Sequence, residues 1–577
     1  MTAAKMAPAG TASSTCCRRR FRLALEGSPA FFCAMRFWCF PRLVSVLCAA
    51  LLAGSCARRE PPVEVATREH TLLLGNLAEP TDLDPHTSIT YTDQNVILAL
   101  FEGLTALDEK TSRAVPGVAE RWDVSDDGRT YTFHLRPAAR WSNGDAVTAR
   151  DFAYSFERIL SPGLASEYSY LLWPIRGAQA FNRGDVKPFA DVGVTVVDDH
   201  TLRLTLERPT PYLLALAANP VWFPVHRATI EKFGRIDQRS TAWTRPGNLV
   251  GNGAFTLAEW LPNARIVVSK NAHYWGAAAN TLEKIVFLPT ENPDVEERGF
   301  RTGQVHITYG VPIEKIARYR ETAPEQLRLD PFLQTFFLRF NVTRPPLDRP
   351  EVRQAIALAI DREALARAVL RGSRLAAPHF TPPGCAGYTA EARVGFDLAK
   401  ARALLADAGF PNGEGLPVLE FQFRNDDTQP KVAEAIQSML GQIGVRVSLA
   451  PFEQKTWLQN QQSLAYTIVF SAWVGDFADP ATFLDLFAGG GGNNWTGWAD
   501  AEYDRWLQEA SRLTDSNARF ALFQRAEARL LAQAPITPLF FGARTYLINP
   551  AVKNWEPALL GFHRYQFVRL EPAAPAY

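Results

Sequence analysis

The chain has 577 residues, of which 47% are hydrophobic and 21% are charged, and its formal net charge is +1. Residues 1–55 hold seven of the 61 basic and one of the 60 acidic residues, so the remainder holds 54 and 59, a net charge of −5. A body without a basic surplus argues against nucleic acid as a partner. The length exceeds what one hydrophobic core supports, so we expect several domains.

The first 55 residues are typical of a targeting segment rather than of a fold. The apolar run Leu43–Ala53 is too short to span a bilayer as a stable helix, and it lies between Arg42 and the small residues that precede Cys56. This order resembles the signal of a bacterial lipoprotein, in which the cysteine is lipidated and becomes the mature N-terminus. Ordinary secretion with cleavage elsewhere is the alternative. The expected segments are an upstream stretch 1–34 from a start codon placed too early, a signal peptide 35–55, the lipid attachment site Cys56 and a tether 57–68.

Cysteine and histidine usage indicates neither a disulfide framework nor a metal site. Six of the seven cysteines lie within residues 16–56, and Cys385 alone lies in the body. A single thiol cannot form an intramolecular disulfide, so we expect Cys385 to be a small packing residue. His134 and His200 fall on a predicted strand and a predicted turn, with no ligand-type residue at a metal-site spacing. We expect neither a metal nor another cofactor.

Hydrophobic periodicity in the first half of the body alternates between strand and helix patterns. Thr148 and Asp151 have the spacing of a capping box, which begins a helix that runs to Leu160. The segment that follows contains Tyr168 and Tyr170, which can either pack in the core or line a binding surface. The other elements expected here are a strand at 71–74, a helix at 95–104 that stops at Gly103, and hairpins at 122–135 and 192–206.

The second half predicts α/β layering, because helices ended by glycine alternate with strands. The expected helices are 350–371, 397–408, 431–443, 503–513 and 518–531, and the expected strands are 336–341, 445–449, 466–470, 545–548 and 566–570. After the strand at 466–470, Trp473 and Asp476 are expected on an irregular segment, and Asp479 directly precedes Pro480 at the start of a helix. A carboxylate in such a place is usually a helix cap or a turn residue. The alternative is that an aromatic ring and a carboxylate hold a cationic group of a ligand.

Seven motifs, in order, resemble the dipeptide- and oligopeptide-binding proteins of ABC importers, the extracytoplasmic solute-binding proteins of family 5. They are Glu79–Pro85, Phe101–Leu104, Val196–Leu202, Gly247–Phe255, Phe340–Pro346, Val352–Arg362 and Trp473–Pro480. The resemblance implies an α/β fold of the type II periplasmic binding proteins, a three-domain, two-lobed clamshell with a discontinuous lobe I. The implied parts are lobe I at 69–104, 226–333 and 545–577, an inserted small domain at 105–225, and the α/β lobe II at 334–544.

The same resemblance assigns a ligand site. Asp476 falls at the position that binds the α-ammonium group of the peptide, and it becomes our main site residue, while Asp479 keeps the helix-cap interpretation. The other implied ligand-binding residues are Ala472, Trp473 and Val474 beside the extended peptide, Tyr168 and Tyr170 in the cleft, and Gln454 at the position of a pocket tryptophan.

The sequence also departs from the family pattern at the carboxylate end of the ligand. Phe470 stands where an arginine occurs in the oligopeptide binders, and Pro430 stands where a histidine can meet peptide C-termini. Arg371 or Arg374 could take over that function, and we assign it to neither. The departures leave open the length of the peptide that is bound.

The implied function is that of a binding protein rather than an enzyme: a monomer that closes on an oligopeptide and delivers it to an ABC permease and its ATPase subunits. It would act in the periplasm or cell envelope, touching a membrane through its lipid anchor only. Other family cargoes, namely a muropeptide, a nickel chelate or an opine-like solute, are alternatives. A secreted hydrolase is a further alternative, but no Gly-x-Ser-x-Gly or His-Glu-x-x-His motif supports it.

Overall fold

The computed structural model describes residues 60–572 except 89, 187 and 427. The first sheet has the strand order β1-β10-β9-β8, with β1 (Thr71–Gly75) parallel to β10 (Lys284–Leu288). Strands β9 (Arg265–Lys270) and β8 (Phe255–Leu261) complete it in antiparallel register. Helix α3 (Tyr91–Leu100) contacts β8 and presents buried residues along most of its length. Tyr91, the first residue of this helix, belongs to the candidate functional site.

The second sheet contains both predicted hairpins, which the structure confirms. Its strands are β4 (Ala119–Val124), β5 (Thr130–Leu135), β7 (Thr201–Thr205) and β6 (Val194–Asp198), all antiparallel. Alternate residues of β5 are buried, as a strand with one face on the core requires. The capping box is also confirmed: Thr148 caps α4 (Ala149–Leu160), and Asp151 accepts a hydrogen bond from the backbone N–H of Thr148 at 2.7 Å.

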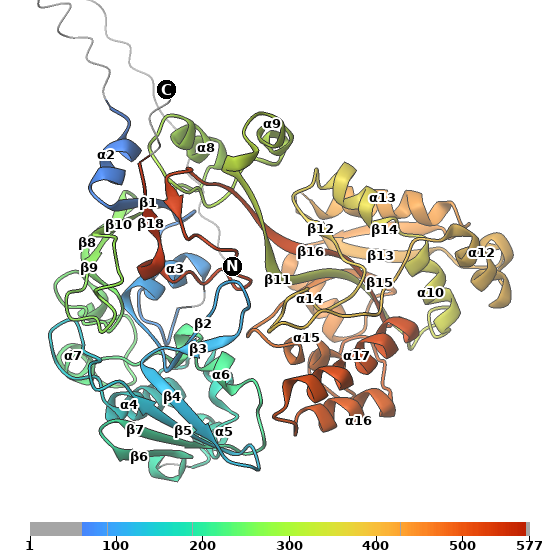
Figure 1. Cartoon of the computed structure of the whole chain (residues 1–577). Helices are drawn as coiled ribbons and strands as arrows, with labels where there is room; N and C mark the ends of the chain where they lie inside the picture. Colours follow the sequence, from blue (N-terminus) through green and yellow to red (C-terminus); the bar gives the residue numbers. More distant parts are fainter. Residues whose placement is uncertain (1–59, 89, 187, 427, 573–577) are drawn as a thin grey trace, which may run out of the picture. The chain divides into compact units, whose positions relative to one another are not determined.

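The third sheet is mixed and has the strand order β12-β16-β11-β15-β13-β14. Its longest members, β11 (Leu327–Phe340) and β16 (Ile536–Leu547), run antiparallel and side by side (Figure 1). Strand β15 (Ile468–Val474) is antiparallel to β11 and parallel to β13 (Leu419–Arg424), which pairs in parallel with β14 (Val447–Phe452). The alternation of helices and strands predicted for this half is therefore present.

Helices cover this sheet with apolar side chains from several segments. Helices α10 (Pro350–Leu358), α12 (Leu398–Asp407) and α13 (Gln429–Gly441) contribute to one core with the strands. A second core contains α15 (Ala481–Leu484), α16 (Ala501–Ala510) and α17 (Ser516–Gln533), and α16 and α17 lie side by side (Figure 1). Cys385 is fully buried in that second core, so the expected packing role is confirmed.

Several predicted boundaries are wrong, for local reasons. The helix expected at 95–104 begins at Tyr91, where Thr90 caps it, and ends at Leu100 because Phe101 has an extended backbone. Gly103 does not end that helix; a Cβ there would lie 2.6 Å from the carbonyl oxygen of Ala217, so close packing requires the glycine. The helix expected at 350–371 is interrupted, because Asp361 caps a new one, α11 (Arg362–Ala364).

The end of the predicted tether belongs to the fold. Residues Pro62–Arg68 form helix α2, and the side-chain hydroxyl of Thr67 lies 3.0 Å from Nε2 of His306. The predicted division into lobes stays a prediction, and its boundaries at 333/334 and 544/545 fall inside β11 and β16. In the described part of the chain, no helix is both long and apolar enough to cross a membrane. The predicted upstream stretch 1–34, the predicted signal peptide at 35–55 and the predicted lipid attachment site Cys56 lie outside the described residues.

The remaining elements are shorter. They are β2 (Thr105–Leu107), β3 (Ala114–Pro116), α5 (Ala178–Arg183), α6 (Leu213–Leu216), α7 (Arg227–Phe233), α8 (Pro293–Arg301), α9 (Ile316–Thr322), β12 (Leu375–Ala376), α14 (Gln454–Gln462), β17 (Val552–Lys553) and β18 (Arg569–Leu570).

Candidate functional site

Strand β15 has one open edge at its C-terminal end. It pairs with β11 from Ile468 to Val474, whereas β13 pairs with it only at Ile468 and Val469. The carbonyl oxygen of Phe470 on the open side accepts a hydrogen bond from Nε1 of Trp457 at 3.1 Å. Beyond it, no strand of the described residues pairs with 471–474 on that side. An open edge of this kind can accept an extended peptide as an additional strand.

The strand extends further than the sequence predicted. Trp473 belongs to β15 rather than to an irregular segment, and its indole N–H donates to the carbonyl oxygen of Thr482 at 2.7 Å. Ala472 and Val474, predicted to lie beside the peptide, are half-buried on the same strand. Gly475 follows, and its N–H donates to the carbonyl oxygen of Leu333 at 2.8 Å. The chain after β15 is therefore held closely against the turn at Thr482 and against β11.

The backbone of Asp476 is held from two sides. Its N–H donates to the hydroxyl of Thr482 at 3.1 Å, and its carbonyl oxygen accepts from the side-chain amide of Asn219 at 3.3 Å. The next residue, Phe477, stacks on Tyr212 with ring centroids 4.4 Å apart and an interplanar angle of 11°. These contacts hold the backbone at Asp476 and use neither oxygen of its carboxylate.

The carboxylate of Asp476 has no positively charged partner among the described residues. Burial raises its pKa from 3.8 to about 6, and a hydrogen bond from the Tyr170 hydroxyl lowers it in part. Among the ion pairs of residues 60–572, none includes Asp476. Removing an ionised carboxylate from water is unfavourable unless hydrogen bonds or an opposite charge compensate it. A cationic group that enters the site would supply that charge.

Two predicted residues lie next to Asp476. Tyr168 and Tyr170 flank the 3-10 turn Ser169–Leu172, and their ring centroids are 6.0 Å apart. Burial raises the pKa of both hydroxyls, and the charge of Asp476 raises it further. The structure therefore brings Asp476, Tyr168 and Tyr170 together, although they are about three hundred residues apart. Gln454, by contrast, is exposed in the first turn of α14 and stays a prediction.

Asp479 belongs to the structure of the next helices rather than to this site. Its Oδ1 accepts a hydrogen bond from the backbone N–H of Ala481 at 2.9 Å, and Pro480 is the N-cap residue of α15, so Asp479 is a turn carboxylate directly before the helix rather than its cap. Both carboxylate oxygens also accept from Arg519, each at 2.6 Å, and both side chains are almost completely buried. A paired and buried carboxylate of this kind is not available to a ligand.

Two cavities are lined by residues that neighbour Asp476 in the structure or the chain. One, of about 410 Å³, is lined by Tyr170, Tyr212, Phe477 and neighbouring residues. The other, of about 340 Å³, is lined by Tyr91, Tyr309, Phe332, Gln334, Arg374, Arg544 and other residues. Burial raises the pKa of the Tyr91 hydroxyl, while the charge of Arg544 lowers it and that of Asp476 raises it.

Sequence reasoning missed most of these partners. Tyr91, Asn219 and Thr482 have no local pattern that separates them from ordinary loop or helix residues. Thr482 could have been noted, because it lies within one turn of Asp479-Pro480 and threonine often bonds nearby backbone groups. The sequence suggested Arg374 as one of two candidates for the carboxylate end of the ligand, and it did not suggest Arg544.

Comparisons with known proteins identify relatives along nearly the whole chain. Residues 113–495 match the family described as "Bacterial extracellular solute-binding proteins, family 5 Middle". The periplasmic oligopeptide-binding protein OppA of Escherichia coli is 34% identical over 523 residues, covering 88% of this chain and 94% of OppA. The periplasmic murein peptide-binding protein MppA of the same organism is 35% identical over 525 residues, covering 89% and 96%. A solved structure of MppA in its unliganded open form matches with a TM-score of 0.80 at 33% identity, covering 87% of this chain and 97% of that one.

Proposed function

The chain belongs to the bacterial extracellular solute-binding proteins of family 5, and we propose that it binds peptides with a free N-terminus and delivers them to an ABC permease. The predicted family and its α/β periplasmic-binding-protein fold are confirmed. The chain is a binding protein and not an enzyme, as predicted, since members of this family bind solutes and the relatives are named for the peptides that they bind.

The observation that carries the proposal is the state of Asp476. Asp476 is half-buried, the Tyr170 hydroxyl lies close enough to lower the pKa that burial raises, and no ion pair of the described residues includes the carboxylate. The α-ammonium group of a peptide would supply that cation, and a charge-assisted hydrogen bond of this type contributes about 1.5–3 kcal/mol. It would set the register of the peptide without selecting side chains.

The open edge of β15 supports an extended peptide as the ligand. Gly475 and Thr467 bond to the β11 side of the strand, so the alternation of an antiparallel pair leaves the backbone groups of Ala472 and Val474 on the open side, where they can pair with a peptide backbone regardless of its sequence. Cavities lined by neighbours of Asp476 leave room for side chains. Ligand that contacts parts of the protein on both sides of the site favours a closed state, which a permease can recognise. Ala472 and Val474 are therefore our candidates for the backbone contacts, and Trp473, whose backbone faces β11, can contribute its ring.

Replacement of the anchor tests the proposal. Asp476→Asn should weaken binding of trialanine by about ten- to a hundredfold, measured by isothermal titration calorimetry, because the neutral amide cannot pair with the ammonium group. N-acetyl-trialanine, which lacks that charge, should lose much less affinity. The matched control is Asp126→Asn in the exposed turn between β4 and β5, which should leave both affinities unchanged. Equal losses for the free and acetylated peptides would refute the assignment of Asp476.

A murein peptide is the second candidate cargo. The observation that favours it is the 35% identity with a protein that is named for binding murein peptides. Native mass spectrometry of the protein purified from its own cells would separate the two, because a co-purified murein peptide contains diaminopimelate or another cell-wall residue and a nutritional peptide does not.

The attachment to a membrane is a separate proposal, which rests on residues 43–56. We propose that the protein acts in the periplasm or cell envelope and is anchored through lipid on Cys56. Cells grown with radioactive palmitate should label the wild-type protein and not Cys56→Ser, as read by autoradiography of the immunoprecipitated protein. Ser55→Ala is the matched control. Labelling that persists in Cys56→Ser would contradict the lipid anchor.

A further inference from the structure

One aromatic pair connects two apolar cores of the protein. The first core contains buried side chains of the first and second sheets and of α3, α4 and α6, and the other is the core of α15, α16 and α17. Tyr212, directly before α6, and Phe477, in the turn between β15 and α15, each pack against both cores. Their rings are stacked with centroids 4.4 Å apart. The stack therefore lies at the junction between the two cores.

The first core sets the position of Tyr212. Helix α6 begins at the next residue, and its Leu213 and Leu216 are buried in that core. The carbonyl oxygen of Leu214 accepts a hydrogen bond from the hydroxyl of Thr105 at 2.7 Å. Burial raises the pKa of the Tyr212 hydroxyl to about 12, so the side chain is neutral at physiological pH. Tyr212 therefore brings an uncharged ring, fixed by α6, to the junction.

The partner ring belongs to the turn that carries the proposed ammonium anchor. Phe477 directly follows Asp476, whose carbonyl oxygen accepts a hydrogen bond from the side-chain amide of Asn219 at 3.3 Å. Tyr212 precedes the short helix α6 and Asn219 follows it, so the two ends of one element contact two successive residues of the turn. The turn is thus held from the side of the first core at both Asp476 and Phe477.

The other core holds the same turn at its far end. Arg519 of α17 pairs with Asp479, and its guanidinium lies 6.0 Å from the centroid of the Tyr212 ring. The backbone N–H of Asp479 donates to the carbonyl oxygen of Phe477 at 2.9 Å. A displacement of the Tyr212 ring would therefore act on residues 476–479 together rather than on Phe477 alone.

The proposed ammonium site is assembled across this junction. Asp476 supplies the carboxylate, whereas Tyr170, whose hydroxyl lowers the pKa of that carboxylate, comes from the 3-10 turn whose Leu171 and Leu172 are buried in the first core. Tyr170 and the two stacked rings line the same cavity of about 410 Å³. Because Asp476 and Tyr170 come from opposite sides of the junction, the contacts that close the junction also set how these two side chains meet.

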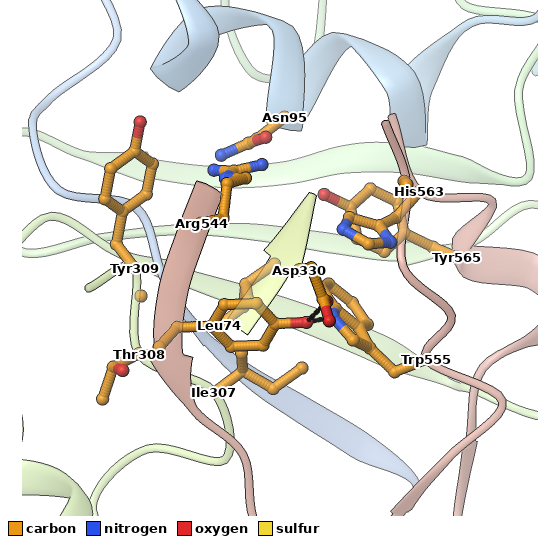
Figure 2. A pocket seen from close by; sticks show the side chains of 13 residues that line it. Leu74, Asn95, Ile307, Thr308, Tyr309, Asp330, Arg544, Trp555, His563 and Tyr565 are labelled. Atoms are coloured by element: carbon orange, nitrogen blue, oxygen red, sulfur yellow. Dashed lines mark hydrogen bonds between the residues drawn. The ribbon is translucent and has the colours of Figure 1, made fainter. Parts of the chain in front are cut away.

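Aromatic stacking by itself does not indicate such a junction. The rings of Trp555 and His563 are also stacked, with centroids 3.8 Å apart, and both side chains line the cavity shown in Figure 2. They come from one C-terminal segment, so their stack joins nearby positions of the chain. Tyr212 and Phe477 come from segments far apart in the sequence and join two cores.

We propose that the Tyr212–Phe477 stack and the Asn219 hydrogen bond form a clasp that positions the Asp476 carboxylate for the ammonium group of the cargo. This inference rests on the proposed function and adds to it the residues that position its anchor from across the junction. Tyr212 and Asn219 are positioning residues, since they act on Asp476 through Phe477 and through the backbone. Without the clasp, the carboxylate would remain but would take orientations that do not pair with the ammonium group.

The ratio of two affinities tests the clasp. Trialanine has an ammonium group and N-acetyl-trialanine does not, so the ratio of their dissociation constants, measured by calorimetry, reports how well Asp476 is positioned. Tyr212→Leu keeps apolar volume but removes the ring, and it should reduce this ratio about two- to tenfold, the range expected for one aromatic pair. Tyr212→Phe keeps the ring and should retain the wild-type ratio. A merely structural defect would weaken the binding of both peptides alike.

A second variant removes the hydrogen bond and leaves both cores unchanged. Asn219→Ser lacks the amide N–H that reaches Asp476, but its hydroxyl can still accept the hydrogen bond that Asn219 accepts from the N–H of Val221. It should reduce the ratio about twofold or more. The matched control is Phe189→Leu, which removes a ring that packs against Phe181 and the first core alone, with centroids 5.4 Å apart. This control should keep the wild-type ratio, and thermal melting checks that each variant folds.

The outcomes separate this inference from the proposed function. An unchanged ratio in both Tyr212→Leu and Asn219→Ser, or a reduction of the same size in Phe189→Leu, would overturn the clasp and leave Asp476 as the anchor. If Tyr212→Leu does not fold, the result for Asn219→Ser decides. A wild-type ratio near one would instead overturn the proposed function, and this inference with it.

Discussion

At the scale of single residues, the proposed anchor is a charged group that has no cationic partner among the described residues. Asp476 is held by its backbone, so its carboxylate remains for a ligand. Asp479, three residues later, has the same side chain and the opposite use, since Arg519 and a helix N–H occupy its oxygens. Phe470, at a position where the family resemblance implied an arginine, is buried and packs near Phe336 and Phe540 with centroids 6.0 and 6.1 Å away. Phe470 therefore contributes to the core and not to the charge of the site.

The pKa of Asp476 predicts how binding depends on pH. Since burial raises that pKa to about 6 in the free protein, the acid becomes protonated as the pH falls through 6 and can no longer pair with an ammonium group. Affinity for trialanine should therefore fall between pH 7 and pH 5, by at most about tenfold per pH unit because one proton is involved. Calorimetry at several pH values measures this slope.

The control for this prediction is Asp476→Asn, whose affinity should change much less over the same range. It is needed because burial also raises the pKa of Glu296 and Asp485 to about 7. The buried histidines His86, His306 and His379 do not interfere, since burial lowers their pKa to about 4. A pH slope that is the same in Asp476→Asn would assign the effect to another group.

At the scale of elements, the turn after β15 depends on a buried ion pair between α17 and the start of α15. Asp479→Asn should lower the free energy of unfolding by about 3–5 kcal/mol, because it leaves the Arg519 charge buried without a partner. Urea denaturation followed by circular dichroism measures it. The control is Glu231→Gln in the exposed pair with Arg227 on α7, which should cost about 0.5 kcal/mol or less. Equal losses in the two variants would contradict a structural role for the buried pair.

At the scale of the whole described chain, the site lies where β11 changes register. The pairing between β11 and β16 shifts between Pro331 and Thr335, and Phe332 and Gln334 of that interval line the cavity with the arginines. Leu333 of the same interval accepts the hydrogen bond from Gly475 that positions the turn before Asp476. One irregularity in a long strand pair thus contributes both to the turn before Asp476 and to that cavity.

The sequence by itself determined the elements whose signal is local. The two hairpins, the capping box at Thr148 and the turn at Asp479 depend on residues a few positions apart, and all are present. Its ordered motifs also identified the family and therefore the fold. The sequence did not determine the ends of all helices. Helix α3 ends before the predicted residue because the backbone of Phe101 is extended, and no neighbouring residue in the sequence requires that conformation.

Only the tertiary structure decided which side chains meet. Asn219 contacts Asp476 across 257 positions, and Tyr91, Tyr170 and Arg544 come from three other segments. The environment of a charge depends on burial and on every charge around it, and neither is a property of neighbouring residues in the chain. That is why sequence patterns could suggest Asp476, whereas the unpaired state of its carboxylate, and the stack of Tyr212 on Phe477, required the packed molecule.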